Sequence, residues 1–213
     1  VFVPQIISIE EFVEELSGLK TLTSVELIFE LYRSYKSATQ ANAVESFESF
    51  SKWAQILLQD FNEIDRSLVP QEQMFDYLKA IKELDHWSLS TNKTDLIQNH
   101  LKFWEKLKIY YKDFSANLLQ SKKGYQGLIY REAAEKLETY IAHNSSKKHV
   151  FLGFNALNTA ESNIIQGLLQ NDLAHIYWDI DKVFIEDPIH DAGLFTRQHL
   201  KRWDYFKKQP FNW

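Results

Sequence analysis

Carboxylates and histidines gather in one short stretch near the end of the chain. Carboxylates two residues apart at the end of a strand can ligate Mg²⁺ or Mn²⁺, and a nearby histidine can act as a base. The simpler interpretation is a helix cap at Asp187 and a solvated turn around it. We favour this interpretation and therefore expect no metal site, no catalytic residue and no cofactor. The stretch consists of His175, Asp179, Asp181, Glu186, Asp187, His190 and Asp191.

A second position with chemical meaning is the end of the apolar run His149–Phe154. A nucleotide-hydrolysing α/β protein keeps carboxylates at the end of such a strand, where they bind Mg²⁺ and position the attacking water. This run ends in Gly153 and Phe154, and neither can ligate a hard cation or accept a proton. The sequence also lacks a G-x-x-x-x-G-K-[ST] string to cradle phosphates. Such a loop could precede Val1, so the missing acids are the stronger observation.

The C-terminal tail alternates cations with aromatic rings. That pattern suits single-stranded nucleic acid, because phosphates meet the cations while bases stack on the rings. We favour the alternative, in which the rings pack against the rest of a larger protein. The possible DNA-binding residues are Arg197, Lys201, Arg202, Trp203, Lys207 and Lys208, and the further rings are Tyr205, Phe206, Phe211 and Trp213.

Composition narrows the function classes. The net charge of −5 argues against a general nucleic-acid coat protein, whose affinity comes mostly from neutralised phosphates. Cysteine is absent, which excludes disulfides and thiolate metal sites and fits a reducing cytoplasm. No apolar run is long enough to span a membrane. The remaining five histidines lack metal-ligand spacing, so we expect surface or capping roles for His86, His100, His143, His149 and His199.

The elements around the strand end form a βαβ pattern. His149–Phe154 and Leu173–Ile180 are apolar runs of strand length, and Asn158 with Glu161 caps a helix between them. Two strands joined by a helix in this way are parallel, with a right-handed connection. Asp187 followed by Pro188 predicts the start of a further helix.

The rest of the chain carries helical signals. Capping boxes at Ser8 and Thr23, each followed by a glutamate three residues on, predict two N-terminal helices. Residues 37–46 are small and polar and indicate a linker. From residue 46 to 142 the apolar residues recur with helical spacing, which predicts a helical bundle.

Several short segments together resemble superfamily I helicases of the UvrD and RecB kind. That family has an Asp-Glu pair where this chain has Gly153-Phe154, and its γ-phosphate-sensing glutamine falls at about Lys182. Asp179 alone matches a functional position. The segments are Val150–Leu152 for the first strand, Asn158-Thr159 for the turn, Leu168-Leu169 for the helix end and Trp178-Asp179 for a Gly-Asp pair.

The resemblance extends to AddB-like proteins of recombination helicase-nuclease complexes, which are described as inactivated helicases with a PD-(D/E)XK nuclease. It implies an α/β fold with a strong helical bias: a partial P-loop NTPase-like parallel sheet with an inserted all-helical subdomain. The expected parts are residues 1–38 and 149–213 for the helicase-like core and residues 39–148 for the inserted bundle. The chain would be an excised piece of a larger protein.

The implied function is a non-hydrolysing module for DNA repair and recombination. It would scaffold a nuclease and a partner motor, with the remaining domains of its parent, a helicase-nuclease subunit and single-stranded DNA as possible partners. The parent would be a cytoplasmic DNA exonuclease. Two alternatives stay open: a pure protein-interaction domain, or part of an active helicase whose acids are supplied elsewhere.

Overall fold

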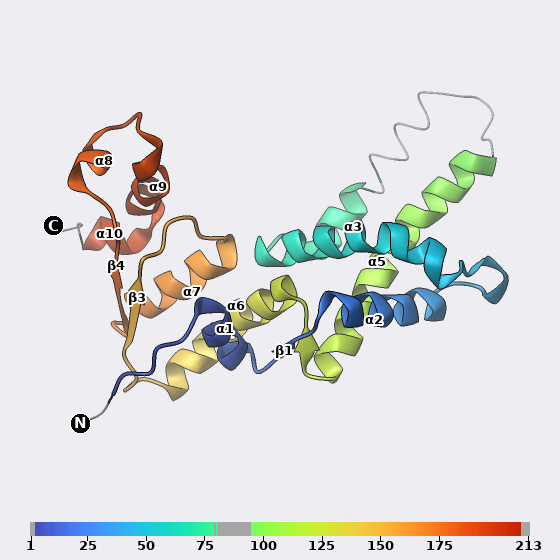
Figure 1. Ribbon diagram of the computed structural model, residues 1–213, viewed down its shortest axis with the longest axis horizontal. Coiled ribbons are helices and arrows are strands. Elements are labelled where there is room, and N and C mark those ends of the chain that lie inside the picture. Colours follow the sequence, from blue (N-terminus) through green and yellow to red (C-terminus); the bar gives the residue numbers. More distant parts are fainter. Residues whose placement is uncertain (1–2, 79, 81–94, 210–213) are drawn as a thin grey trace. The chain divides into compact units, whose positions relative to one another are not determined.

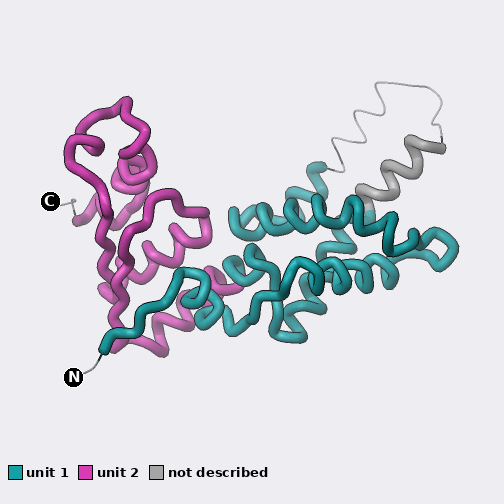
Figure 2. The backbone as a smooth tube through the Cα atoms, viewed as in Figure 1, with its two compact units in different colours: residues 1–131 teal, residues 132–213 magenta. Residues whose placement is uncertain are grey.

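The computed structural model describes the backbone of residues 3–78, 80 and 95–209 (Figure 1). Within these residues the chain is an α/β protein in which helices predominate, as its sequence predicted. The sheets there are two pairs of parallel strands. The chain divides into two compact units, residues 1–131 and residues 132–213 (Figure 2). We call them the helical unit and the C-terminal unit.

The helical unit contains most of the long helices. Its two short strands pair in parallel, with Lys20 opposite Lys123 and Thr21 opposite Gly124. Residues 71–78 are also helical. The elements are α1 (Ile9–Ser17), β1 (Lys20–Thr21), α2 (Ser24–Ser37), η1 (Ala41–Ala43), α3 (Phe47–Arg66), α5 (Asp95–Gln120), β2 (Lys123–Gly124) and the start of α6 (Gln126–His143).

The first two helices begin where the capping boxes predict. The Ser8 hydroxyl accepts the Glu11 N–H, and the Glu11 carboxylate accepts the Ser8 N–H in return. Thr23 and Glu26 repeat the arrangement at α2. Both starts are confirmed because such caps satisfy backbone donors locally, without help from the rest of the fold.

The core of the helical unit is rich in aromatic rings. Tyr35 of α2 packs against Phe50 of α3 and Tyr110 of α5, with ring centroids 4.9 and 5.5 Å apart. Further along, Phe61 packs edge-on against Tyr111 at 5.1 Å. These contacts account for part of the high aromatic content, because each ring removes a large apolar area from water.

Helix α2 belongs to this core. It packs against both α3 and α5, and Leu31 and Tyr35 on its inner side are buried. Residues 1–38 were predicted to belong with residues 149–213, whereas the compact units divide after residue 131. Neither residue 38 nor residue 148 is a boundary between them. Helical periodicity shows that α2 has a buried face but not which helices cover it.

A buried ion pair joins the end of α3 to α6. Asp65 is fully buried, and its Oδ1 accepts the Arg131 Nε–H at 2.6 Å and the Tyr111 hydroxyl at 2.6 Å. The Tyr125 hydroxyl donates to Oδ2. Arg131 Nη2 donates to two backbone carbonyls, one in the last turn of α3 and one in the loop beyond it, at 3.0 and 2.8 Å. We call these four residues the Asp65 network.

The C-terminal unit follows the predicted βαβ order and then adds short helices. The strands are shorter than the apolar runs, because the backbone leaves the ladder at Gly153 and after Tyr177. After the end of α6 come β3 (His149–Leu152), α7 (Thr159–Gln170), β4 (Ala174–Tyr177), α8 (Lys182–Glu186), η2 (Asp191–Gly193), α9 (Leu194–Arg202) and α10 (Asp204–Lys208).

Strands β3 and β4 are parallel, as predicted. His149 lies opposite Ala174 and Leu152 opposite Tyr177. Asn158 caps α7 with Glu161, again as predicted. The buried face of α7 carries Ala160 and four larger aliphatic side chains, and α7 contacts β4. One face of the two-stranded sheet is therefore covered by its own crossover helix.

The helix start predicted at Asp187-Pro188 is wrong. Helix α8 ends at Glu186, and α9 begins only at Leu194. The Asp187 carboxylate instead accepts the N–H groups of Ile189 and His190, at 2.9 and 3.3 Å. Aspartate makes the same kind of bond in a turn as at a helix start, so the sequence signal does not separate the two.

Candidate functional site at the carboxyl ends of β3 and β4

A ligand-binding or catalytic site is expected at the carboxyl ends of the parallel strands. In open α/β sheets, ligands bind in the crevice outside these ends. Here β3 leads into Gly153 and Phe154, and β4 leads into Trp178 and Asp179. The Gly153 N–H still donates to the Tyr177 carbonyl at 3.2 Å, so the two loops start side by side.

Gly153 and Phe154 have structural roles at this position. Gly153 has a φ of 73°, in the left-handed region that favours glycine, although a Cβ added there would meet no atom within 4 Å. An aspartate there would be strained as well as chemically different. Phe154 is half-buried and packs edge-on against Phe151, with ring centroids 6.0 Å apart. Phe154 is therefore only partly packed at the strand end.

The other two positions of the helicase comparison lie on the surface. Asp179 is exposed in the loop after β4. Lys182 is the first residue of α8, and its Nζ lies 3.5 Å from a Glu186 carboxylate oxygen. Asp181 caps the same helix by accepting the Val183 N–H at 2.9 Å. The polar side chains of this loop therefore stabilise helix α8.

A cluster of four rings packs the loop after β4 against α9 and α10. Trp178 stacks on His199 of α9, with centroids 5.4 Å apart and planes 15° from parallel. His199 also packs on Trp203 at 5.1 Å, and Trp203 stacks on Phe206 of α10 at 5.8 Å. We call these four residues the Trp178 cluster. Helix α9 is thereby fixed to the loop after β4.

His199 also fixes α9 to the loop after β3. Its Nε2 lies 3.0 Å from the Asn155 carbonyl oxygen. A carbonyl only accepts, so Nε2 carries the proton and donates it. The ring is buried, with 8% of its surface exposed. His199 therefore spans the loops at the carboxyl ends of both strands.

The electrostatics of His199 favour a neutral ring. Burial lowers its pKa, the hydrogen bond to the Asn155 carbonyl raises it, and the nearby Arg202 cation lowers it further. The net direction is downward from the ordinary value of 6.5. A buried, neutral, stacked imidazole suits packing rather than proton transfer to a ligand.

The sequence pointed to surface or capping roles for this histidine, and that prediction is wrong. His199 is buried, and so is Trp203, four residues later. Residues four apart lie on the same side of a helix, so this spacing was the signal available in the sequence. His149 is half-buried between the Tyr140 hydroxyl and the Leu173 carbonyl. His86 and His100 lie outside the residues whose side chains are described.

Two of the six possible DNA-binding residues are committed to internal contacts. Arg197 donates to the backbone carbonyls of Phe184 and His190, the latter at 2.7 Å, and so holds the loop between α8 and α9. Trp203 is buried in the Trp178 cluster, with 3% of its surface exposed. Both side chains therefore take part in contacts within the C-terminal unit.

The other four cations of the tail are exposed. Lys201 and Arg202 lie in the last turn of α9, and Lys207 and Lys208 lie in α10. Lys207 Nζ is 2.5 Å from an Asp204 carboxylate oxygen. Phe211 and Trp213, which the sequence analysis added to this set, lie outside the described residues.

The acid-rich stretch is spread along the loops rather than gathered. Its members cap α8 and the turn at Asp187, and the His190 Nδ1 accepts the Ala192 N–H at 3.2 Å. Among the residues that the structure describes, no group of three or more histidine, cysteine or acidic side chains could hold a metal ion. In the same part of the chain, no helix is long and apolar enough to cross a membrane.

Comparisons with known proteins give no match: no family model, no curated protein and no solved structure resembles this chain closely enough to be significant.

Proposed function

We propose that this chain is part of a non-hydrolysing, helicase-like module that serves as a scaffold in DNA repair or recombination. In this proposal the C-terminal unit is a partial P-loop-like sheet that keeps the βαβ order but has lost the nucleotide chemistry. The parent protein would be a DNA exonuclease with its nuclease elsewhere.

The contacts that bridge the loops after β3 and β4 are the observation that carries the proposal. A nucleotide-hydrolysing site needs carboxylates and open space at the carboxyl ends of the strands. Here the residue after β3 is a glycine with positive φ, and His199 connects the loops through Asn155 and Trp178. A ring cluster in that place supports a packing role and leaves Asp179 as an isolated surface acid.

A pure protein-interaction domain is the second candidate, and the tail favours it. Two of the six possible DNA-binding residues, Arg197 and Trp203, make contacts inside the fold. The remaining cations are fewer, and one of them, Lys207, already has an acidic neighbour. This makes contacts with protein a stronger candidate than contacts with DNA.

Nucleotide turnover tests the proposal directly. Steady-state ATP hydrolysis with excess Mg²⁺ would be measured on this chain and on a longer protein that contains it. We expect no turnover above a protein-free blank, because no carboxylate pair is present to hold Mg²⁺ and orient water. Turnover that disappears in Asp179→Ala would overturn the proposal and favour an active helicase.

A further inference from the structure

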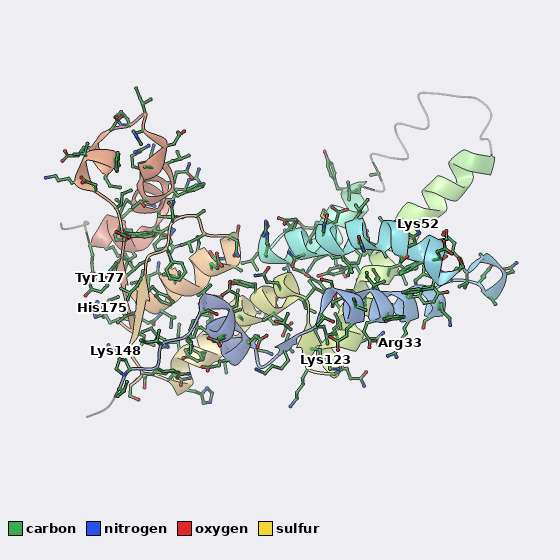
Figure 3. All side chains as sticks on the ribbon, in the orientation of Figure 1. Arg33, Lys52, Lys123, Lys148, His175 and Tyr177 are labelled. Atoms are coloured by element: carbon green, nitrogen blue, oxygen red, sulfur yellow. The ribbon has the colours of Figure 1, made fainter. Side chains whose placement is uncertain are left out.

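Within the described residues of the C-terminal unit, one face of the β3–β4 sheet has no cover. Alternate residues point to opposite sides of a strand, and Phe151 and Ala174 on the α7 side are buried. On the other side Val150, Leu152 and Tyr177 are 56, 66 and 60% exposed. Figure 3 shows Tyr177 in a row with His175 and Lys148 along the side of the sheet away from α7. We call this side the open sheet face.

Parallel sheets are rarely left in this state. Their strands are normally covered by helices on both faces, because the strands are too apolar to meet water on either side. The open sheet face follows that rule in its composition, since an apolar pair on β3 lies beside the Tyr177 ring on β4. What it lacks is the second layer.

The size of the open sheet face fits a single helix. Each strand has four residues, which span roughly 13 Å, and two neighbouring strands make a strip roughly 10 Å wide. An α-helix with its side chains has a diameter of about 10 Å, and two to three turns cover about 13 Å. A stable dimer between two copies buries about 800 Å² on each partner, far more than this strip offers.

The charges at the two ends of the strip favour one direction for a bound helix. Lys147 and Lys148 precede β3 and outnumber Asp172, which precedes β4, so the amino ends of the strands carry a net positive charge; Lys148 Nζ also donates to the Asp172 carbonyl. Asp179 follows β4 at the carboxyl ends. A helix that runs antiparallel to the strands would place its negative C-terminal end near Lys148 and its positive N-terminal end near Asp179.

We propose that the open sheet face binds one amphipathic α-helix of a partner protein, antiparallel to β3 and β4. The apolar stripe of that helix packs on Val150, Leu152 and Tyr177, and its last turn lies near Lys148. The inference deepens the scaffold function proposed above and rests on it for the presence of a partner. It does not depend on how the strand ends lost their acids.

The test uses this chain and a defined probe. The probe is a fluorescein-labelled, helix-stapled 18-residue peptide with leucines at i, i+3, i+4 and i+7 spacing and an uncharged polar face. Fluorescence anisotropy should show weak, saturable binding. Leu152→Glu should weaken it about tenfold or more, because the substitution removes a buried leucine from the interface. Lys148→Glu should weaken it about two- to fivefold, as expected for one charge at a helix end.

Ile189→Glu is the matched control. It replaces another exposed apolar side chain by the same charged residue. Ile189 is 86% exposed in the loop after α8, so the substitution should leave peptide binding unchanged. All three substitutions are at exposed positions, so circular dichroism melts should overlay that of the unmodified chain.

Three results would overturn the inference. One is peptide binding that is absent, or equal in the unmodified chain and Leu152→Glu. Another is a dimer, seen by light scattering, that Leu152→Glu dissociates, because the occupant would then be a second copy. The third is labelled single-stranded DNA that binds and is lost in Tyr177→Ala, which would make the face a stacking surface. None of these readouts involves ATP turnover, so a failure here differs from a failure of the non-hydrolysing scaffold.

Discussion

The Asp65 network and the Trp178 cluster stabilise a buried titratable side chain in opposite ways. Each buries a group that can carry charge and uses it to hold helices together. Asp65 is surrounded by donors, two from tyrosine hydroxyls and one from Arg131. His199 is surrounded by rings and has a single polar contact, the Asn155 carbonyl.

This difference predicts which kind of change destabilises each region. A buried carboxylate needs its donors, and the loss of one partner leaves a charge without compensation. Burial also raises the pKa values of Tyr111 and Tyr125, so both hydroxyls stay protonated and keep donating. The histidine of the Trp178 cluster avoids the cost of a buried charge by staying neutral. The helical unit should therefore be sensitive to substitution, and the C-terminal unit to acid.

Replacing Arg131 should have one of the two largest effects on stability. Arg131→Met keeps most of the side-chain volume but leaves Asp65 buried without its cation. We expect the free energy of unfolding to fall by about 3–5 kcal/mol, as for other broken buried pairs. Urea unfolding followed by circular dichroism measures this loss.

Two controls separate the lost ion pair from lost packing. Asp65→Leu combined with Arg131→Met removes both charges and should recover most of the stability, because apolar replacements of buried pairs are often neutral. Arg66→Ala breaks the exposed pair with Glu63 and should cost less than about 1 kcal/mol. If Arg131→Met costs no more than Arg66→Ala, the network contributes little.

How far the sequence predicts each region follows from how local its interactions are. The capping boxes at Ser8, Thr23 and Asn158 were predictable, since every bond lies within three residues. Asp65 and Arg131 are 66 positions apart, and each looks like a surface residue of an amphipathic helix. Periodicity identifies a buried face, but it does not identify a polar residue that finds its partner only in the folded chain.

The candidate site was predictable in composition but not in geometry. The sequence shows that an apolar run of strand length ends in Gly153 and Phe154. It therefore also shows that carboxylates are missing at this strand end. That His199 would bridge the two loops was not visible, because the bond to Asn155 depends on where α9 packs. The error at Asp187 has the same origin, since a local signal fits both a turn and a helix start.

The second prediction compares two phenylalanines of the C-terminal unit. Phe151 is buried at 7% exposure, so Phe151→Ala should cost about 3–5 kcal/mol. Phe154 is only half-buried beside it, so Phe154→Ala should cost roughly half as much. Denaturant unfolding of both variants measures the difference. Equal losses would mean that Phe154 fills the strand end as tightly as a core residue.

Acid should distinguish the C-terminal unit from the helical unit. Burial lowers the pKa values of both His149 and His199 below 6.5. The unfolded chain therefore takes up protons first as the pH falls through 6.5, and stability present above that pH is lost below it. Unfolding curves between pH 7.5 and 5 measure the loss, and His199→Gln should flatten the pH dependence.

Site-resolved measurement sharpens this prediction. The ring protons of His199, followed by NMR as the pH is lowered, should report a midpoint below 6.5. A His199 midpoint above 6.5 would show that the imidazolium is favoured, and the Trp178 cluster would then hold a cation like the Asp65 network.

The smallest effect we expect concerns DNA. Any contact with single-stranded DNA should map to the exposed cations at the ends of α9 and α10, because the rest of the chain is acidic. Binding should be weak, insensitive to base sequence and steeply reduced by salt. Fluorescence anisotropy of a labelled oligonucleotide across salt concentrations measures it. Lys201→Ala/Arg202→Ala should lower the slope of log affinity against log salt by about 0.7 for each phosphate contact removed.

A matched pair of cations in the helical unit makes this prediction specific. Lys52 and Lys123 are also exposed, and Figure 3 labels both. Lys52→Ala/Lys123→Ala removes the same net charge and should leave the salt slope unchanged if the contact lies in the C-terminal unit. Equal losses in both double variants would indicate a diffuse response to net charge. No binding at low salt would leave the tail without a nucleic-acid role, and the rings of the Trp178 cluster would then serve packing alone.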